Sequence, residues 1–380
     1  MTRLTPGKGT RAAALKRLRS SLPILLLLIS SMGAAACPLC YEAARQMLTE
    51  GTRLDAADRA VLAAPEADGS PLQVVAVVKG KDMDGAIIAD PVAGNAMTVP
   101  AGEALLLVHS AADAGWTSLG SIPRAYAEWL RAIVATREIG GDAPQRSWPM
   151  TPATADILTY AGWRQRVALV LPYLEIANPL AARLAWGELA RAPYAAIDVA
   201  RSKIEPAKVT GWIDDPRLSS RRAAYLMLLG FAGGAVEAKG LGARLEAALA
   251  FHDARDLAAL FAADLQLDGA SRVEWIETRV FGDRSRTMPE IEAALLALKV
   301  LGDANGAVPR ARIIEAYRSF IKRRPAMAGF VAPQLADWGY WDAAADYFAI
   351  VKASPELDPA SHFAITVYLQ RAAEAGVRIQ

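Results

Sequence analysis

The second half of the chain alternates apolar and polar residues with the period of an α-helix. Three segments place apolar side chains three or four positions apart: Tyr225–Ala232, Leu241–Leu249 and Ile291–Leu298. Each segment makes one apolar stripe on a helix that is too short to be stable alone, so neighbouring helices must bury it. The pattern predicts a stack of packed helices over residues 178–302 and helical structure throughout residues 153–380.

Capping residues mark where these helices begin. Asn178, Asp215 and Asp358 each precede a proline. Their side chains can accept a hydrogen bond from a free backbone N–H, and proline needs no donor at the first helical position. Thr287 and Glu290 have the spacing of a capping box. These residues predict four helix N-termini.

Glycines indicate where helices end and how often the pattern repeats. Gly230, Gly269 and Gly302 follow apolar stripes, and glycine favours the left-handed turn after a helix. Their intervals are 39 residues (269 minus 230) and 33 residues (302 minus 269), close to the period of two-helix HEAT or armadillo-type units. We therefore predict a HEAT-like α-solenoid, with an irregular all-α domain as the alternative.

A small β domain is predicted before the helices. Five β-prone runs are separated by Gly, Asp, Pro and Asn, and they cover residues 59–64, 72–80, 85–92, 103–110 and 116–121. Asp84 and Gly85 predict a hairpin turn between the second and third runs. Five strands suit a small barrel of the OB kind, and residues 121–137 predict a helix that closes it.

These patterns predict an α+β multidomain chain. A signal peptide at residues 1–36 is followed by a β domain at 37–135, a linker rich in Gly and Pro at 136–152 and the helical domain at 153–380. Nine tryptophans are scattered through the chain, and we expect those among apolar residues to pack between helices.

The first 36 residues have the composition of an export signal. Six basic residues and no acid precede the cleavage site. The apolar run 22–29 follows the last of these basic residues, and Ala34–Ala36 then supplies an A-x-A site. The apolar run is shorter than the ~20 residues that cross a bilayer. We expect a periplasmic or secreted protein with no integral membrane span after cleavage. The alternative is a lipoprotein with a lipid anchor on Cys37.

Removing the signal changes the charge of the chain. The full sequence has 42 basic and 40 acidic residues. The signal holds six of the basic ones, so the rest has 36 against 40, a net charge of −4. That balance gives no electrostatic footprint for nucleic acid, and we expect none as a partner.

Cys37-Pro38-Leu39-Cys40 holds the only two cysteines. They are candidates for a structural disulfide in an oxidising compartment, for a redox or metal centre, or, at Cys37, for lipidation. Tyr41 excludes c-type haem attachment, because histidine does not follow Cys40. Further metal ligands would have to come from three widely separated histidines: His109, His252 and His362.

Several of these segments together carry a resemblance to a known family. "ACPLC" at the cleavage site, "LQVVAVVKG", "ARLAWGELARAPYAAI", "VTGWIDDP" and "SRRAAYLMLLGFAG" are similar to an uncharacterised family of exported bacterial proteins. Its members begin with Cys-Pro-x-Cys, carry a small netrin-like or OB-like β domain and end in HEAT-like helices. The strand that ends in Lys79-Gly80 is typical of the netrin-like barrel. The resemblance implies this architecture and assigns no functional residues.

We expect a non-enzymatic interaction scaffold that presents a helical-repeat surface to a protein partner in the cell envelope, because repeat arrays supply extended binding surfaces. The sequence contains no P-loop, dinucleotide fingerprint, nucleophile elbow or HExxH motif. We therefore assign no catalytic, cofactor-binding or metal-binding residue and expect no cofactor. The alternative is a periplasmic thiol-redox or metal-handling protein that acts through Cys37 and Cys40.

The first prediction concerns the N-terminus of the mature protein. Signal peptidase should cleave after Ala36, because Ala34–Ala36 presents small residues where the enzyme requires them. Mass spectrometry of the protein from the envelope fraction should find Cys37 as the first residue. A diacylglycerol adduct on Cys37 would establish the lipoprotein instead, and an intact Met1 would contradict export by cleavage.

Overall fold

The computed structural model describes residues 49–67, 70–89, 92–93, 99–111, 114–142, 158–353 and 357–378. All of them belong to one compact unit. The signal peptide, the Cys-Pro-Leu-Cys motif and most of the linker predicted at 136–152 lie outside the described residues. Within the described ranges, every strand precedes residue 124 and the remainder is helical, as the sequence predicts.

The sheet follows a short helix and contains four longer strands and one short one. The elements are α3 (Glu50–Ala56), β1 (Arg59–Pro65), β2 (Leu72–Lys79), β3 (Val92–Ala93), β4 (Glu103–His109) and β5 (Trp116–Pro123).

Four of the five predicted strand runs are confirmed. Of the run at 85–92, the described residues contribute Val92, which begins β3, and an isolated bridge between Ile87 and Gln73. The predicted turn at Asp84-Gly85 is confirmed, because the amide of Ala86 donates to the carbonyl of Met83 and Gly85 has a φ of +81°.

The strands lie in the order β2-β1-β4-β5-β3. The first four pair antiparallel, with Val61 opposite Leu107 in the β1–β4 ladder, and β3 runs parallel to β5. A closed barrel would need the edge strands β2 and β3 to pair with each other, and the described residues contain no such ladder. The structure thus shows a small, mainly antiparallel sheet, and OB-like closure stays a prediction.

Helices make up most of the described chain after the sheet. In the first half they are η2 (Arg124–Tyr126), α4 (Ala127–Ala135), η3 (Thr136–Glu138), α5 (Tyr160–Val170), η5 (Leu171–Tyr173), α6 (Pro179–Arg191), η6 (Tyr194–Ser202), α7 (Pro206–Asp214), η7 (Pro216–Arg221) and α8 (Arg222–Ala232). In the second half they are α9 (Ala235–Ala250), α10 (Leu257–Asp268), α11 (Ala270–Ile276), η8 (Glu277–Phe281), α12 (Met288–Ala304), α13 (Arg310–Arg323), η9 (Pro325–Val331), α14 (Ala332–Asp337), α15 (Ala344–Ala353) and α16 (Pro359–Glu374).

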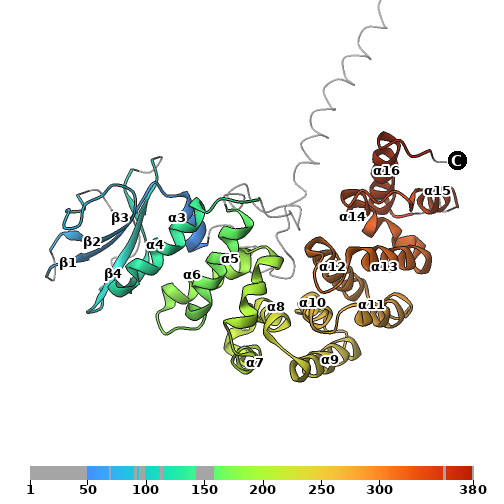
Figure 1. Ribbon diagram of the computed structural model, residues 1–380, viewed down its shortest axis with the longest axis horizontal. Helices are drawn as coiled ribbons and strands as arrows, with labels where there is room; N and C mark the ends of the chain where they lie inside the picture. The colour runs from blue at the N-terminus through green and yellow to red at the C-terminus, as the bar shows by residue number, and fades with distance from the viewer. Residues whose placement is uncertain are drawn as a thin grey trace, which may run out of the picture. The chain divides into compact units, whose positions relative to one another are not determined.

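The sheet and the helices share one hydrophobic core. One face of the sheet, which includes Leu62 and Leu106, packs with Leu130 of α4, a helix that lies along the sheet (Figure 1), and with Leu180 and Leu184 of α6. The opposite face forms a smaller, separate core that includes Val61, Leu107 and Trp116. The described part of the β domain is therefore joined to the helical array by continuous packing.

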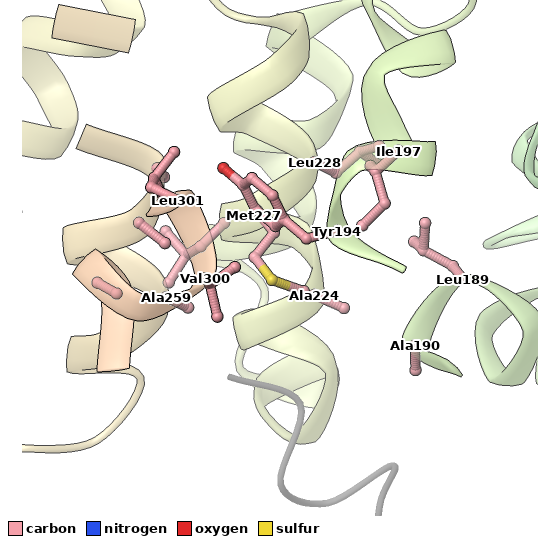
Figure 2. Close-up of a cluster of buried hydrophobic side chains, with 14 of the residues drawn as sticks. Leu189, Ala190, Tyr194, Ile197, Ala224, Met227, Leu228, Ala259, Val300 and Leu301 are labelled. Carbon is pink, nitrogen blue, oxygen red and sulfur yellow. The ribbon is translucent and has the colours of Figure 1, made fainter. Parts of the chain in front are cut away.

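In the middle of the array, each even-numbered helix packs on the next even-numbered helix. α8 contacts α10, α10 contacts α12, and α9 and α11 contact α10 from the side. The arrangement leaves α10 enclosed, with all residues from Ala259 to Leu265 buried. Tyr194 at the start of η6 enters the same core among Met227 and Leu228 of α8, with Val300 and Leu301 of α12 in the same cluster (Figure 2).

The predicted helix starts are confirmed. Asn178 accepts from the amide of Ala181 at 2.9 Å and caps α6. Asp215 caps the 3-10 helix η7, and Asp358 caps α16. Thr287 and Glu290 form the capping box of α12. Each of these caps depends on residues within three positions, which is why the sequence alone identifies them.

Two of the three predicted helix ends are wrong. Gly269 does end α10, with a φ of +66°. Gly230 and Gly302 instead lie inside α8 and α12, where neighbouring segments approach too closely for a side chain. A Cβ at Gly230 would lie 2.8 Å from Cα of Ala263, and a Cβ at Gly302 would lie 2.5 Å from the ring of Trp338. The predicted repeat period is derived from the spacing of these glycines as helix ends, so the structure does not support that derivation. The helices are nevertheless stacked.

Replacing Gly302 tests this role in packing. Gly302→Ala should lower the free energy of unfolding by about 1–3 kcal/mol, because the new methyl group overlaps Trp338. Gly240→Ala is the matched control, since Gly240 also lies inside a helix but has nothing within 4 Å of an added Cβ. That change should raise stability by up to about 1 kcal/mol. Urea denaturation of both variants makes the comparison, and equal effects would contradict the packing role.

Candidate functional site

The residues that the sequence offers for redox or metal chemistry do not form a site in the described structure. Cys37 and Cys40 lie outside the described residues. His109 ends β4, where its ring meets Trp116 edge-on at 5.4 Å. His252 lies in the loop after α9, and His362 lies on α16. Among the described residues, no three histidine, cysteine or acidic side chains gather closely enough to hold a metal ion.

The densest group of charged side chains is instead a buried cluster that the sequence analysis does not identify. It consists of Asp55 on α3, Arg166 on α5, and Glu188 and Arg191 on α6. Nη1 of Arg166 donates to Oδ2 of Asp55 at 2.7 Å and to Oε2 of Glu188 at 3.2 Å. Nη2 of Arg191 contacts Oε1 of Glu188 at 2.8 Å. The side chains of Arg166 and Glu188 are fully buried.

All five N–H groups of Arg166 find an acceptor. Besides the two carboxylates, the guanidinium donates to the hydroxyl of Thr136 at 2.8 Å and to the carbonyl of Ile133 at 2.9 Å. Both groups belong to the end of the helix that follows the sheet. Thr136, the first residue of the predicted linker, is thus buried in the core. Arg166 therefore connects α3, α6 and the sheet's helix through one side chain.

Close packing of α3 on α6 places Asp55 in this cluster. A Cβ at Gly51 would lie 1.4 Å from Oε1 of Glu188, so only glycine allows α3 to approach that carboxylate. At Gly187 a Cβ would lie 3.2 Å from Cβ of Thr49, the N-cap of α3.

Lys79 holds the other end of α3. Its ammonium donates to the carbonyl of Asp55 at 2.8 Å and also reaches the carbonyls of Leu54 and Ala57. These carbonyls lie at the C-terminal end of the helix, where a cation is favoured. Burial, together with Arg137, lowers the pKa of Lys79. The Lys-Gly strand end that the resemblance singles out thus anchors α3 to β2.

The electrostatics of the cluster favour the charged, paired state. Burial opposes ionisation of Asp55, but the hydrogen bond and charge of Arg166 outweigh it, so the pKa of Asp55 lies below its ordinary value. A lowered carboxyl pKa contributes stability above the unfolded value, and this contribution is lost as the pH falls through the folded value. Two guanidinium groups balance two carboxylates, and only Arg191 of the four is partly exposed. The cluster joins α3, α5 and α6.

Smaller polar clusters also lie inside the helical array. Among the described residues, all but one of the carboxylate oxygens of Asp303 and Asp264 are paired, the exception being Oδ1 of Asp264. Oδ1 of Asp303 accepts from Nε1 of Trp338 at 2.8 Å and from Nε2 of Gln334 at 3.1 Å, and burial raises the pKa of Asp303. Burial also raises the pKa of Asp264 to about 6, although Arg272 binds its other oxygen. The expected packing of tryptophans between helices is confirmed at Trp338, which stacks on Tyr317.

The surface shows apolar side chains that no described element covers. On α16, buried residues including Ile365 and Tyr368 face the core, whereas Phe363 and Val367 lie four positions apart on the opposite face. Phe363 is 69% exposed and Val367 is 37% exposed. On α15, which packs against α16, Phe348 is 44% exposed. Exposed apolar side chains of this kind on α15 and α16 can contact another apolar surface, as can Val236 and Phe251 at the two ends of α9.

Comparisons of the chain with protein-family models, with curated proteins and with solved structures gave no match. Among the described helices, none is both long enough and apolar enough to cross a membrane.

Removing Arg166 should expose the role of the buried cluster. Arg166→Met leaves two buried carboxylates with one fewer partner, so the free energy of unfolding should fall by about 3–5 kcal/mol. Arg164→Met is the matched control on the same helix. Its ion pair with Asp198 is more than one-third exposed on both sides, and its loss should cost about 0–1 kcal/mol. Chemical denaturation at neutral pH measures both, and similar losses would show that burial does not strengthen the dependence on Arg166.

Proposed function

We propose that this protein is a non-enzymatic scaffold that binds a protein partner through the surface of its helical array, in the periplasm or outside the cell. The observation that carries the proposal is the face of α16 opposite its buried stripe, where Phe363 and Val367 are exposed on adjacent turns. An exposed apolar pair of this kind gains free energy when a partner covers it.

The pairing of buried charged side chains with one another supports the same proposal. The buried ionisable side chains around Arg166 and Asp303 bind one another or backbone groups. They stabilise helix contacts and present no reactive group at the surface. The contacts of α8 with α10, and of α10 with α12, make a rigid framework on which surface residues keep fixed positions.

We further propose that the array is a HEAT-like α-solenoid and that the sheet is related to an OB-like barrel. The packing of every second helix supports the first assignment, because solenoid units stack by contact between equivalent helices. The strand order, with β1 central between β2 and β4, supports a small β domain built mainly from antiparallel neighbours.

The alternative function is thiol-redox or metal handling through Cys37 and Cys40. A reduction potential of roughly −120 to −270 mV for this pair would favour that alternative, whereas a value below about −300 mV would indicate a structural disulfide.

Site-specific photocrosslinking tests the scaffold function. A photoreactive phenylalanine analogue at Phe363 of the full-length chain should give one discrete adduct in cells of the source organism. The same analogue at Lys239, an exposed residue on α9, should not. Val367→Asp should abolish the Phe363 adduct with only a small change in the thermal midpoint, because Val367 is partly exposed and lies on the face of α16 opposite its buried stripe. No adduct at Phe363, or equal adducts at both positions, would contradict the proposal.

A further inference from the structure

Unpaired cationic side chains gather at one place in the helical array. Arginines nearby each contact a carboxylate: Arg272 binds Asp264, Arg279 binds Glu246, Arg286 binds Asp283 and Glu290, and Arg312 binds Glu277. Four other cations in the same region have no carboxylate within 4 Å among the described residues. They are Arg284, Arg318, Lys322 and Arg323, and we call them the α13 basic patch.

The four residues are linked in space. Arg318 and Lys322 lie one turn apart on α13. Nη1 of Arg323 would lie 3.1 Å from a Cβ at Gly282, so this guanidinium reaches the segment that carries Arg284. Arg284 is also close enough to the buried Arg324 to lower its pKa, after the larger effect of burial. The patch therefore spans the C-terminal half of α13 and the loop after η8.

The surroundings of the patch do not neutralise it. Asp283, the acidic residue beside Arg284, accepts from Ser285 and Arg286. Glu315 on α13 points to solvent and lies 3.9 Å from Arg312. Nε of Arg318 is buried and has no hydrogen-bond partner in the described structure. The Nε of Arg318 is covered by the protein, so contacts with a bound carboxylate would fall to the exposed side chains of the patch, Arg284, Lys322 and Arg323.

We infer that the α13 basic patch binds an acidic segment of the partner protein. This inference rests on the proposed scaffold function and specifies the chemistry of the partner. Guanidinium forks match carboxylates in shape and charge, and clustered cations attract an acidic chain before contact. The charge of the patch is the opposite of such a segment. The Nε of Arg323 already donates to the hydroxyl of Ser319 at 3.1 Å, so its terminal nitrogens are the ones that face a ligand.

An anionic membrane surface fits the patch less well than an acidic peptide. Binding at a bilayer interface usually combines cations with apolar side chains that enter the lipid. The large, exposed apolar residues of the described chain include none on α13 or η8, and Met288 at the start of α12, 47% exposed, is the one nearest to Arg284 in sequence. The α13 patch therefore provides charge and hydrogen-bond donors without a cluster of apolar side chains.

Fluorescence anisotropy tests the inference with two labelled probes, an octapeptide of glutamate and an octapeptide of glutamine. The full-length chain should bind the glutamate peptide at about 50 mM salt and much more weakly at about 300 mM salt, because screening shortens the range of the attraction. It should not bind the glutamine peptide. Lys322→Gln combined with Arg323→Gln should weaken glutamate-peptide binding about tenfold, since two charge-assisted contacts are lost. Arg284→Gln alone should weaken it severalfold.

The matched control removes the same two residue types elsewhere. Arg201 and Lys203 at the end of η6 are exposed and have no ion-pair partner among the described residues. Arg201→Gln combined with Lys203→Gln should leave binding within about twofold, because net charge alone then changes. Absence of glutamate-peptide binding, or equal weakening in the control, would overturn the inference. Tighter binding to phosphatidylglycerol vesicles than to the peptide would overturn it in favour of a membrane surface.

The crosslinking assay distinguishes a failure of the patch assignment from a failure of the scaffold function. If the Phe363 adduct forms but the glutamate peptide does not bind, the patch assignment fails while the scaffold function stands. If neither is seen, the scaffold function fails as well. Peptide binding that is lost specifically with Lys322 and Arg323, at an unchanged thermal midpoint, supports the assignment.

Discussion

The guanidinium of Arg166 is the interaction on which the arrangement of the first half of the chain depends. It is fully buried, and it uses every donor to hold α3, α6 and the end of the helix that covers the sheet. A buried charge is costly unless its partners are in place, so any displacement of these elements that breaks the contacts of Arg166 is opposed. Gly51 and Gly187 serve the same constraint, since they let α3 approach Glu188 and α6.

This constraint explains why the described sheet does not behave as a separate module. Lys79 at the end of β2 binds the C-terminus of α3, and Arg166 binds the side chain of Asp55 on the same helix. The sheet residues Leu62 and Leu106 share a core with the helices. Thr136 begins the segment that looks like a linker in the sequence, yet it is an acceptor for Arg166. Composition identifies polar and flexible residues, but it does not reveal whether a distant side chain needs them.

Structural features that depend on neighbouring residues can be predicted from the sequence, whereas features that depend on distant residues cannot. The caps at Asn178, Thr287 and Asp358 depend on neighbours within three residues, and they are confirmed. Gly230 and Gly302 look identical to helix-ending glycines in sequence, but their role is set by Ala263 and Trp338, which lie more than 30 residues away. For the same reason the α13 basic patch cannot be recognised from the abundance of arginine. It stands out only once the paired arginines around it are known.

The buried cluster also has a consequence for the order in which the chain acquires its structure. Asp55 is separated from Arg166 by 111 residues and from Arg191 by 136 residues. During synthesis, α3 and the first strands emerge long before the residues that complete their core. Until α6 is available, Asp55 remains hydrated and the apolar face around Leu62 has no cover from α6. α3 and the sheet therefore reach their final state late, and until then their apolar face depends on protection from premature association.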